Sequence, residues 1–502
     1  MTDVYTTDVA APFETRLLID GEFRDGAEGA TFPTWNPATG RELAQVALAS
    51  RADVDAAVAA ARGAFEGAWA KTSPARRARM LNRLAQLLDE RTDELATLES
   101  RNNGKPRWQA AAEIKTAVAT LELFAGAALH LYGRSHVVNP SILTYTLREP
   151  VGVCGAIIPW NYPLMMAVWK VAPALAAGNT LVLKPASATP LTALALGQLA
   201  LEAGIPAGVL NVVTGPGSSV GEALASHPDV DKIAFTGETT TGRRIAAVAA
   251  DTLKRVSLEL GGKSPNIVFA DADLDAAVVG SLWAVYYSAG QSCEARTRLL
   301  VQDGVYDRFA ATFTEKAAGL KVGDPLAEDT KVGSLISRAH AARVLSFVEG
   351  ALDEGAELLT GGAVDGELGE GLDAAAFVRP TVIGEVRNDM HIAQEEVFGP
   401  VVTLQRFTDE ADAVKWANDV RYGLAATVWT GDTARGHRVA QRVRSGAVGI
   451  NTPFVAFPGI PFGGFKESGY GREQSLEALD LYTETKAVLV GTSPRPVNPL
   501  GV

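Results

Sequence analysis

One of the two cysteines of this 502-residue chain stands where a reactive thiol is expected. Cys293 lies in the segment YSAGQSCEAR, among small and polar residues, whereas Cys154 lies in the apolar run VGVCGAII. A thiol kept for packing belongs in an apolar run, and a reactive one in more polar surroundings. Cys293 is therefore a candidate nucleophile.

Two further residues could assist a cysteine that attacks a carbonyl group. Such an attack needs a hydrogen-bond donor for the oxyanion and a base that later activates water. Asn161 is a rigid amide donor, because it stands between Pro159 and Pro163. Glu259 closes the segment VSLE, where alternation places its carboxylate opposite the apolar side chains. An ion pair between Glu259 and Lys263 is the structural alternative.

Other catalytic sites have weaker support. GSSVG at 217–221 matches the G-x-S-x-G elbow of serine hydrolases, but the later histidines lie in helical or charged stretches (His340, His391 and His437). Glu395 and Glu396 could form a glycosidase pair, but neighbours on a strand point in opposite directions. No HExxH sequence and no Cys/His pair at ligand spacing predicts a metal site.

Length and charge limit the class of protein. A chain of 502 residues exceeds the size of one hydrophobic core, so at least two domains are expected. With 46 basic and 58 acidic residues the net charge is -12, which disfavours nucleic acid as a partner. The N-terminal MTDVYTTDVAAPFETR carries aspartates where a signal peptide needs a basic start, so we expect a cytoplasmic location. The uncharged stretch 151–169 is broken by PWNYP, so no membrane span is expected.

The elements that must position these residues alternate along the chain. From residue 180 the pattern predicts strands at 180–184, 208–213, 232–235 and 255–260, with helices at 190–204, 220–226 and 240–250. This order predicts a doubly wound parallel α/β sheet with ligands at the carboxyl ends of its strands. A strand at 265–270, a helix at 274–288 and a strand at 298–302 begin a second α/β domain.

Segments at both ends of the chain add to this plan. Helices are expected at 52–65 and 75–88, and exposed strands at 141–147 and 485–491 that another subunit could pair. The loops GPGSSVG at 215–221 and FTGETTTG at 235–242 each follow a strand and open a helix. A helix N-terminus can receive a pyrophosphate, but either loop could equally be an ordinary turn.

These segments together resemble the aldehyde dehydrogenase superfamily, in its non-acylating, betaine-aldehyde-dehydrogenase-like subgroup. The matching motifs are PWNYP (159–163), KPA (184–186), FTG (235–237), LELGGKSPN (258–266), GQSC (290–293), EEVFGP (395–400) and PFGGFKESGYGRE (461–473). The resemblance implies a Rossmann-like cofactor-binding domain (1–131 and 151–262), an α/β catalytic domain (263–474) and a small β oligomerisation arm (132–150 and 475–502). It also implies a homodimer or homotetramer.

The resemblance assigns roles to the candidate residues. Cys293 would be the nucleophile, and its backbone N–H and Asn161 would form the oxyanion hole. Glu259 would activate the water that hydrolyses the thioester, with Lys170 and Glu473 relaying its proton. An NAD(P) cofactor would be bound by Ile158, Trp160, Lys184, Ser187, Gly217, Gly221, Phe235, Gly237, Glu238, Leu260, Glu396 and Phe398. The substrate site would be lined by Tyr162, Met166, Trp169, Tyr287 and Phe462.

Three residues depart from the family pattern. Ser187 replaces the glutamate that NAD-preferring members usually carry after KPA, so NAD is favoured only slightly over NADP. Glu238 stands where many relatives have a serine near the pyrophosphate. Glu294 beside the nucleophile would raise the pKa of the thiol if it faces the sulfur.

The expected reaction is the oxidation of an aldehyde to a carboxylic acid through a thiohemiacetal and a thioester. An aromatic enclosure favours a neutral aliphatic or aromatic aldehyde, because relatives acting on betaine or amino aldehydes often carry acidic residues where this chain has Lys115 and Thr116. Oxidation of a cationic aldehyde, held by cation–π contacts, is the alternative. A cofactor-independent thiol esterase that uses Cys293 and Asn161 is a second one.

Overall fold

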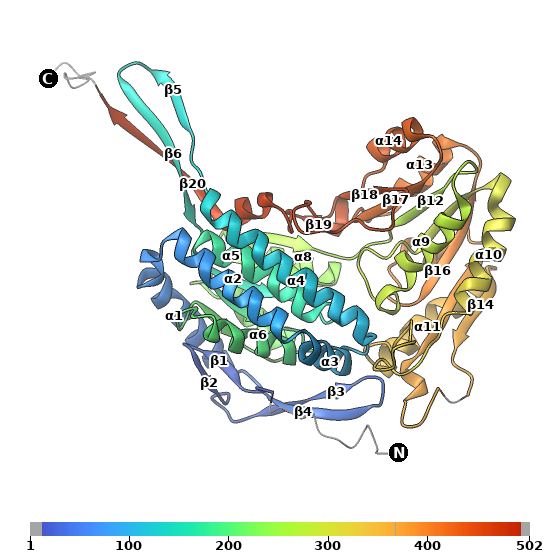
Figure 1. The fold of residues 1–502 in the computed structure, drawn as a ribbon, viewed down its shortest axis with the longest axis horizontal. Helices are drawn as coiled ribbons and strands as arrows, with labels where there is room; N and C mark the ends of the chain where they lie inside the picture. Colours follow the sequence, from blue (N-terminus) through green and yellow to red (C-terminus); the bar gives the residue numbers. More distant parts are fainter. Residues whose placement is uncertain (1–12, 367, 493–502) are drawn as a thin grey trace.

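The strands of the chain form four sheets in the computed structural model, which describes residues 13–366 and 368–492 (Figure 1). The largest has the order β19-β11-β10-β7-β8-β9-β1-β2. Its central strands, β11 to β9 in that order, run parallel, and β1, β2 and β19 are antiparallel additions. The bounds are Gly469–Tyr470 (β19), Arg255–Glu259 (β11), Lys232–Thr236 (β10), Val153–Ile157 (β7), Thr180–Lys184 (β8), Leu210–Val212 (β9), Leu17–Ile19 (β1) and Glu22–Arg24 (β2).

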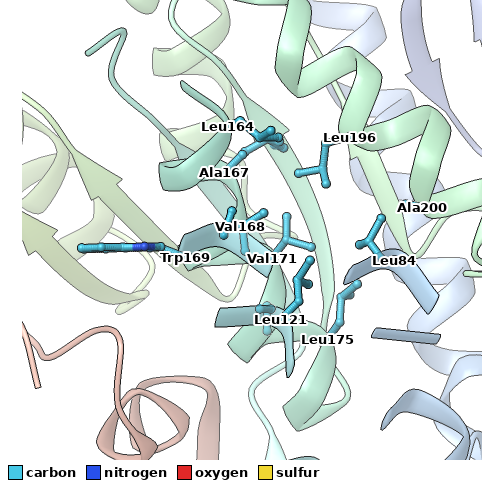
Figure 2. Packing of buried hydrophobic residues seen from close by; sticks show 14 of the residues in the cluster. Leu84, Leu121, Leu164, Ala167, Val168, Trp169, Val171, Leu175, Leu196 and Ala200 are labelled. Carbon is cyan, nitrogen blue, oxygen red and sulfur yellow. The ribbon is translucent and has the colours of Figure 1, made fainter. Parts of the chain in front are cut away.

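Helices bury both faces of this first sheet because its central strands are apolar on both sides. Leu181 and Leu183 of β8 pack with α2, α4, α5 and α6, and Val182 between them packs with α1, α7 and α8. Figure 2 shows the first of these clusters, in which Trp169 of α5 points away from the other labelled side chains. The bounds are Arg51–Glu66 (α1), Pro74–Glu90 (α2), Thr92–Asn103 (α3), Arg107–Ala127 (α4), Pro163–Ala177 (α5), Leu191–Glu202 (α6), Glu222–Ser226 (α7) and Thr239–Ala250 (α8).

A second sheet has the order β14-β15-β16-β13-β12-β17-β18 and is parallel except for β14. Its strands are Pro265–Val268 (β12), Arg298–Gln302 (β13), Glu357–Ala363 (β14), Val378–Gly384 (β15), Val401–Phe407 (β16), Ala425–Trp429 (β17) and Ala447–Ile450 (β18). Its helices are Leu274–Tyr286 (α9), Tyr306–Ala318 (α10), Arg338–Asp353 (α11), His391–Gln394 (α12), Glu410–Asn418 (α13) and Thr433–Arg442 (α14). Helices α9 to α11 cover one face, and α13 and α14 the other.

Two small sheets complete the fold. Strands β3 (Thr31–Asn36) and β4 (Arg41–Ala47) form a hairpin. Strands β5 (Ser135–Asn139), β6 (Ile142–Pro150) and β20 (Thr483–Gly491) form an antiparallel sheet that projects from the rest of the described chain (Figure 1). We call this sheet the arm. Part of the predicted arm range, 493–502, and the N-terminal residues 1–12 lie outside the described residues.

The predicted elements form, with corrected ends. Strand 180–184 is β8 as predicted, whereas the helix predicted over 274–288 ends at Tyr286. Ser288 and Ala289 adopt φ near 53°, a left-handed conformation that no α-helix continues. Strand β19 lies within 263–474 and pairs with β11 of the first sheet. The domain boundaries themselves stay a prediction.

No helix within the described ranges combines the length and apolar character that a bilayer crossing requires.

Candidate active site

Two cavities meet at Cys293. The first, of about 340 Å³, is lined largely by aromatic side chains, among them Trp108, Trp169, Tyr287 and Phe462, and we call it the aromatic cavity. The second, of about 210 Å³, lies along the carboxyl edge of the first sheet and includes Trp160, Gly237, Glu396 and Phe398; we call it the edge cavity. Both are lined by Tyr162, Met166, Thr236, Glu259 and Cys293. A molecule in one cavity can therefore meet a molecule in the other beside the thiol.

The backbone around Cys293 is held in an unusual shape. A tight turn at 287–290 precedes it, in which Ser288, Ala289 and Gly290 all have positive φ. Non-glycine residues in this region cost energy and are often found at functional sites. The Cys293 carbonyl oxygen lies where a side chain on Gly262 would have to be, only 2.1 Å from an ideal Cβ. The absence of a side chain at Gly262 thus allows the nucleophile loop to lie against the end of β11, which carries Glu259.

The surroundings of Cys293 disfavour the charged form of its thiol. Its pKa is raised well above the usual value, first by burial and then by the charges of Glu294, Glu396 and Glu259. A hydrogen bond from its own backbone N–H lowers the pKa of the thiol. Glu294 therefore has the effect that the sequence predicted for it. Cys154 is fully buried, and burial raises the pKa of its thiol to about 12.

Asn161 is held firmly beside the nucleophile loop. It precedes α5, where Pro163 occupies the first turn, and it is buried. Its Nδ2 donates to the Gln291 carbonyl oxygen at 2.9 Å, and its own carbonyl accepts from Lys105 Nζ at 2.7 Å. An amide nitrogen carries two hydrogens, so one remains for an oxyanion.

Glu259 ends β11 as a buried carboxyl group, and neither of its oxygens has a hydrogen-bond partner in the described part of the chain. Burial raises its pKa well above the usual value, and the Glu473 charge adds to this, whereas Lys170 lowers it. The alternative ion pair with Lys263 is not formed, since the Lys263 amine is equally without a partner among the described residues.

The two predicted relay residues lie next to each other. Lys170 Nζ donates to Glu473 and, at 2.7 Å, to Thr236 Oγ1, and all three side chains are buried. Glu473 is positioned by backbone hydrogen bonds with Phe462, at 2.8 and 3.0 Å. The structure thus brings Glu259, Lys170 and Glu473 into one buried group.

The predicted cofactor residues lie along the carboxyl edge of the first sheet. Trp160, Gly237, Glu238, Leu260, Glu396 and Phe398 line the edge cavity. The other six predicted cofactor residues lie along the same edge but outside the lining of this cavity. They are Ile158, Lys184, Ser187, Gly217, Gly221 and Phe235. Ile158 donates to the Lys184 carbonyl at 3.1 Å, and Ser187 Oγ donates to the Gly215 carbonyl at 2.8 Å.

The edge presents a buried lysine and two carboxyl groups that could contact a dinucleotide. Lys184 is buried, which lowers the pKa of its amine to about 8. Glu396 Oε1 accepts from the Gly262 N–H at 3.0 Å, and burial raises the pKa of this carboxyl to about 7. Glu238 caps helix α8 without a side-chain hydrogen bond to it, which places a negative charge at a helix end that favours anions.

Two residues of the edge cavity lie outside every motif that the sequence predicted. His340 and Arg343 of α11 line it, and His340 Nε2 lies 2.7 Å from the Phe398 carbonyl oxygen. The His340 ring also packs edge-on against Trp160, with centroids 5.5 Å apart. No local motif marks them, because they reach the site only through the packing of α11.

All five predicted substrate residues line the aromatic cavity: Tyr162, Met166, Trp169, Tyr287 and Phe462. Trp169 and Phe462 pack edge-on with centroids 5.6 Å apart. The sequence did not reveal Trp108, Trp283, Phe454 and Phe457, which complete the enclosure. Aromatic residues so far apart in the chain offer no spacing signal.

Acidic residues also line this cavity, although the sequence analysis expected none at its entrance. Glu113 of α4 and Glu294 are part of the lining, as is Thr116. Lys115 is an exposed residue that pairs with Asp89 at 2.5 Å. The helical position that faces the cavity is therefore 113 rather than 115, two residues earlier on α4.

Comparisons with known proteins agree with this geometry. The model of the aldehyde dehydrogenase family matches residues 23–488. An aldehyde dehydrogenase of Emericella nidulans is 46% identical, with 97% of this chain and 98% of the relative covered. One of Aspergillus niger is 47% identical, with 94% of each chain covered.

Solved structures share the fold over nearly the whole chain. The NAD+ complex of an aldehyde dehydrogenase from Bacillus cereus has a TM-score of 0.93 and 44% identity, covering 96% of this chain and 97% of the other. A betaine aldehyde dehydrogenase from Staphylococcus aureus in complex with NAD+ has a TM-score of 0.95 and 38% identity, covering 97% of each. The chain belongs to the aldehyde dehydrogenase family.

Proposed function

We propose that this enzyme oxidises aldehydes to carboxylic acids with NAD or NADP, and that Cys293 is the nucleophile. The observation that carries the proposal is the meeting of two cavities at one thiol, with Glu259 on the wall of both. One cavity suits a small apolar molecule, and the other follows the sheet edge where α/β folds bind nucleotides.

The first half of the reaction uses Cys293 and Asn161. The Cys293 thiol releases its proton to solvent, the resulting thiolate forms a bond to the aldehyde carbon, and the former carbonyl oxygen becomes an oxyanion. The free Asn161 amide hydrogen and the Cys293 backbone N–H stabilise that charge. The nicotinamide of NAD(P), bordered by Trp160, Gly237 and Phe398, would supply the acceptor for the hydride that the same carbon loses, so that a thioester remains on Cys293.

The second half of the reaction uses Glu259. Its carboxylate takes a proton from water, the hydroxide adds to the thioester carbon, and the sulfur leaves as the carboxylic acid forms. Lys170 and Glu473 lie next to Glu259 and can pass the proton onward. This second step restores the thiolate.

Lys184 and Glu396 would hold the two riboses of the cofactor, and Trp160, Gly237 and Phe398 would border it. NAD is favoured, since relatives of known structure were solved with NAD+. NADP stays open, because Ser187 presents no carboxylate that would repel a 2′-phosphate, and its hydroxyl is bonded to Gly215.

The substrate expected from sequence was a neutral aliphatic or aromatic aldehyde. The aromatic lining supports an apolar tail. The carboxyl groups of Glu113 and Glu294 add support to the alternative, an amino or betaine aldehyde, whose positive charge would gain from both rings and carboxylates.

We also propose that the arm associates with further copies of the chain, as a homodimer or homotetramer. Within the described ranges, its edge strands β5 and β20 pair with β6 only, and large apolar side chains are exposed on it, among them Val137 and Leu489. The cytoplasmic location stays a prediction from sequence.

The test follows absorbance of the reduced nicotinamide with a panel of aldehydes, run separately with NAD and NADP. We expect aldehyde-dependent reduction that Cys293→Ala abolishes, with Cys154→Ala as the matched control that retains it. A chain that hydrolyses an activated ester but reduces neither cofactor with any aldehyde would support the thiol esterase instead.

A further inference from the structure

A carboxylate beside the nucleophile is fixed in place by a buried arginine. Glu294 Oε2 accepts from Arg296 Nη1 at 2.9 Å, and the same nitrogen donates to the Glu294 carbonyl at 2.9 Å. Arg296 Nη2 donates to the Pro453 carbonyl, in the loop that carries Phe454. The Arg296 side chain is fully buried, and that of Glu294 is 20% exposed. The orientation of Glu294 is therefore set from both its own loop and the rim of the cavity.

The charge that the aromatic cavity presents is negative. Glu294 and Glu113 line it together with Glu259, and no lysine, arginine or histidine of the described residues does so. The cations that pair with the first two carboxyls, Arg296 and Lys105, lie outside the lining. The charged side chains that the lining presents are therefore all carboxyl groups.

Of these carboxyls, Glu294 is the one best placed to act on a substrate. It is the neighbour of Cys293 in the chain and lines the same cavity, so its charge lies near any molecule bound to the sulfur. Among the neighbouring charges, that of Glu294 raises the pKa of the Cys293 thiol most. Glu113 is more deeply buried, and burial raises the pKa of its carboxyl to about 7.

We propose that Glu294, held by Arg296, sets the charge selectivity of the site: it disfavours aldehydes that carry a carboxylate and admits neutral or cationic ones. This inference rests on the proposed function for its biological meaning. Its physical basis is repulsion between two negative charges in a cavity with a largely apolar lining, which is stronger than in bulk water. Glu294 is thus a specificity-determining residue.

The first test needs neither aldehyde nor cofactor. It measures alkylation of Cys293 in the full-length chain by iodoacetamide, which is neutral, and by iodoacetate, which carries a carboxylate. Iodoacetamide transfers a carbamoylmethyl group to the sulfur and iodoacetate transfers a carboxymethyl group. Iodide leaves in both reactions. The ratio of the two rates cancels any change in thiolate content, so it reports only the charge that the reagent meets.

We expect the iodoacetamide-to-iodoacetate ratio to fall roughly tenfold in Glu294→Gln, which keeps an oxygen for Arg296 but loses the charge. Glu294→Asp should retain the native ratio, and so should Glu315→Gln, which removes an exposed carboxylate on α10. An unchanged ratio in Glu294→Gln would overturn the proposal.

A second test separates this inference from the proposed function. It compares kcat/KM for 4-oxobutanoate, an anionic aldehyde, with that for pentanal, a neutral one of similar length. We expect the anionic-to-neutral ratio to rise about tenfold in Glu294→Gln. If pentanal is oxidised but this ratio does not change, the selectivity role fails while the proposed function stands. If no aldehyde is oxidised, the proposed function fails, and the alkylation ratio still decides on Glu294.

Discussion

At the scale of single residues, Glu259 has the clearest physical signature. A carboxyl group with no hydrogen-bond partner in the described chain is costly when charged, which is why burial raises its pKa well above the usual value. A base must be unprotonated to take a proton from water. The hydrolysis of the thioester is therefore expected to increase with pH through this raised pKa, in a range where an ordinary carboxyl is already ionised.

Replacing Glu259 by glutamine should separate the two halves of the reaction. The variant keeps Cys293 and Asn161, so the first turnover should produce a burst of reduced nicotinamide equal to the enzyme concentration. Steady-state oxidation should then fall by about 10²- to 10⁴-fold, because the base is missing. Stopped-flow absorbance measures both phases. Full steady-state activity in Glu259→Gln would show that another group activates the water.

The residue types at 161, 259 and 293 could be recognised from sequence because each breaks a local pattern. Cys293 stands in a polar turn, Glu259 stands in an apolar strand, and Asn161 stands between prolines. The side chains of Glu113 and Glu294 were harder to place. Whether a helical or loop carboxyl faces a cavity depends on how its element rotates against its neighbours, and α4 turns residue 113 inward rather than 115.

At the scale of elements, the buried parallel strands were the best predicted. An apolar run such as TLVLK at 180–184 has one physical solution, burial on both faces, and it forms β8 with those bounds. The helix predicted over 274–288 extended past Tyr286 because Ser288 and Ala289 are ordinary helix residues by sequence. Their left-handed conformation is imposed by the surrounding structure, so no local preference could reveal it.

Strand β10 begins with a lysine that sequence alone would place in solvent. Lys232 is instead buried, with Nζ donating to Ser257 Oγ at 3.0 Å and lying 4.9 Å from the centre of the Tyr482 ring. Burial lowers the pKa of its amine from 10.5 to about 8. Between pH 8 and 10.5 the unfolded chain binds more protons at this site, so the free energy of unfolding rises with pH there.

The variant Lys232→Met removes this dependence. Relative to the variant, the native chain should gain about 3 kcal/mol of stability between pH 8 and 10.5, since one pKa unit corresponds to about 1.4 kcal/mol. The measurement is the difference between the two urea midpoints at several pH values. Lys71→Met, at an exposed lysine, is the control and should show no such trend. A difference that stays constant with pH would contradict a lowered Lys232 pKa.

At the scale of the whole molecule, the two large sheets are joined through the active site. Strand β19 comes from the segment after the second sheet and pairs with β11, the strand that ends at Glu259. The loop of Cys293 starts within the second sheet's helices and packs on Gly262. Alternating strands and helices predicted two sheets, but a two-residue strand with no apolar pattern could not be predicted. The nucleophile and its base therefore depend on contacts between the two sheets.

The arm provides the last prediction. Its exposed apolar side chains would be unfavourable on an isolated chain, since Val137 is 97% and Leu489 65% exposed. The outer edges of β5 and β20 pair with no other strand of the described chain, so a second copy can pair with them. We therefore expect the native chain to have a mass of two or four times 52.7 kDa in light scattering after gel filtration.

Replacing both Val137 and Leu489 by lysine should shift that mass toward 52.7 kDa, because charges on an edge strand block further pairing. Val279→Lys is the control, since this valine is 60% exposed and lies on α9, among the helices of the second sheet. It should leave the mass unchanged. A native chain that already runs as a single copy, or a double variant that keeps the native mass, would show that the arm does not hold the assembly together.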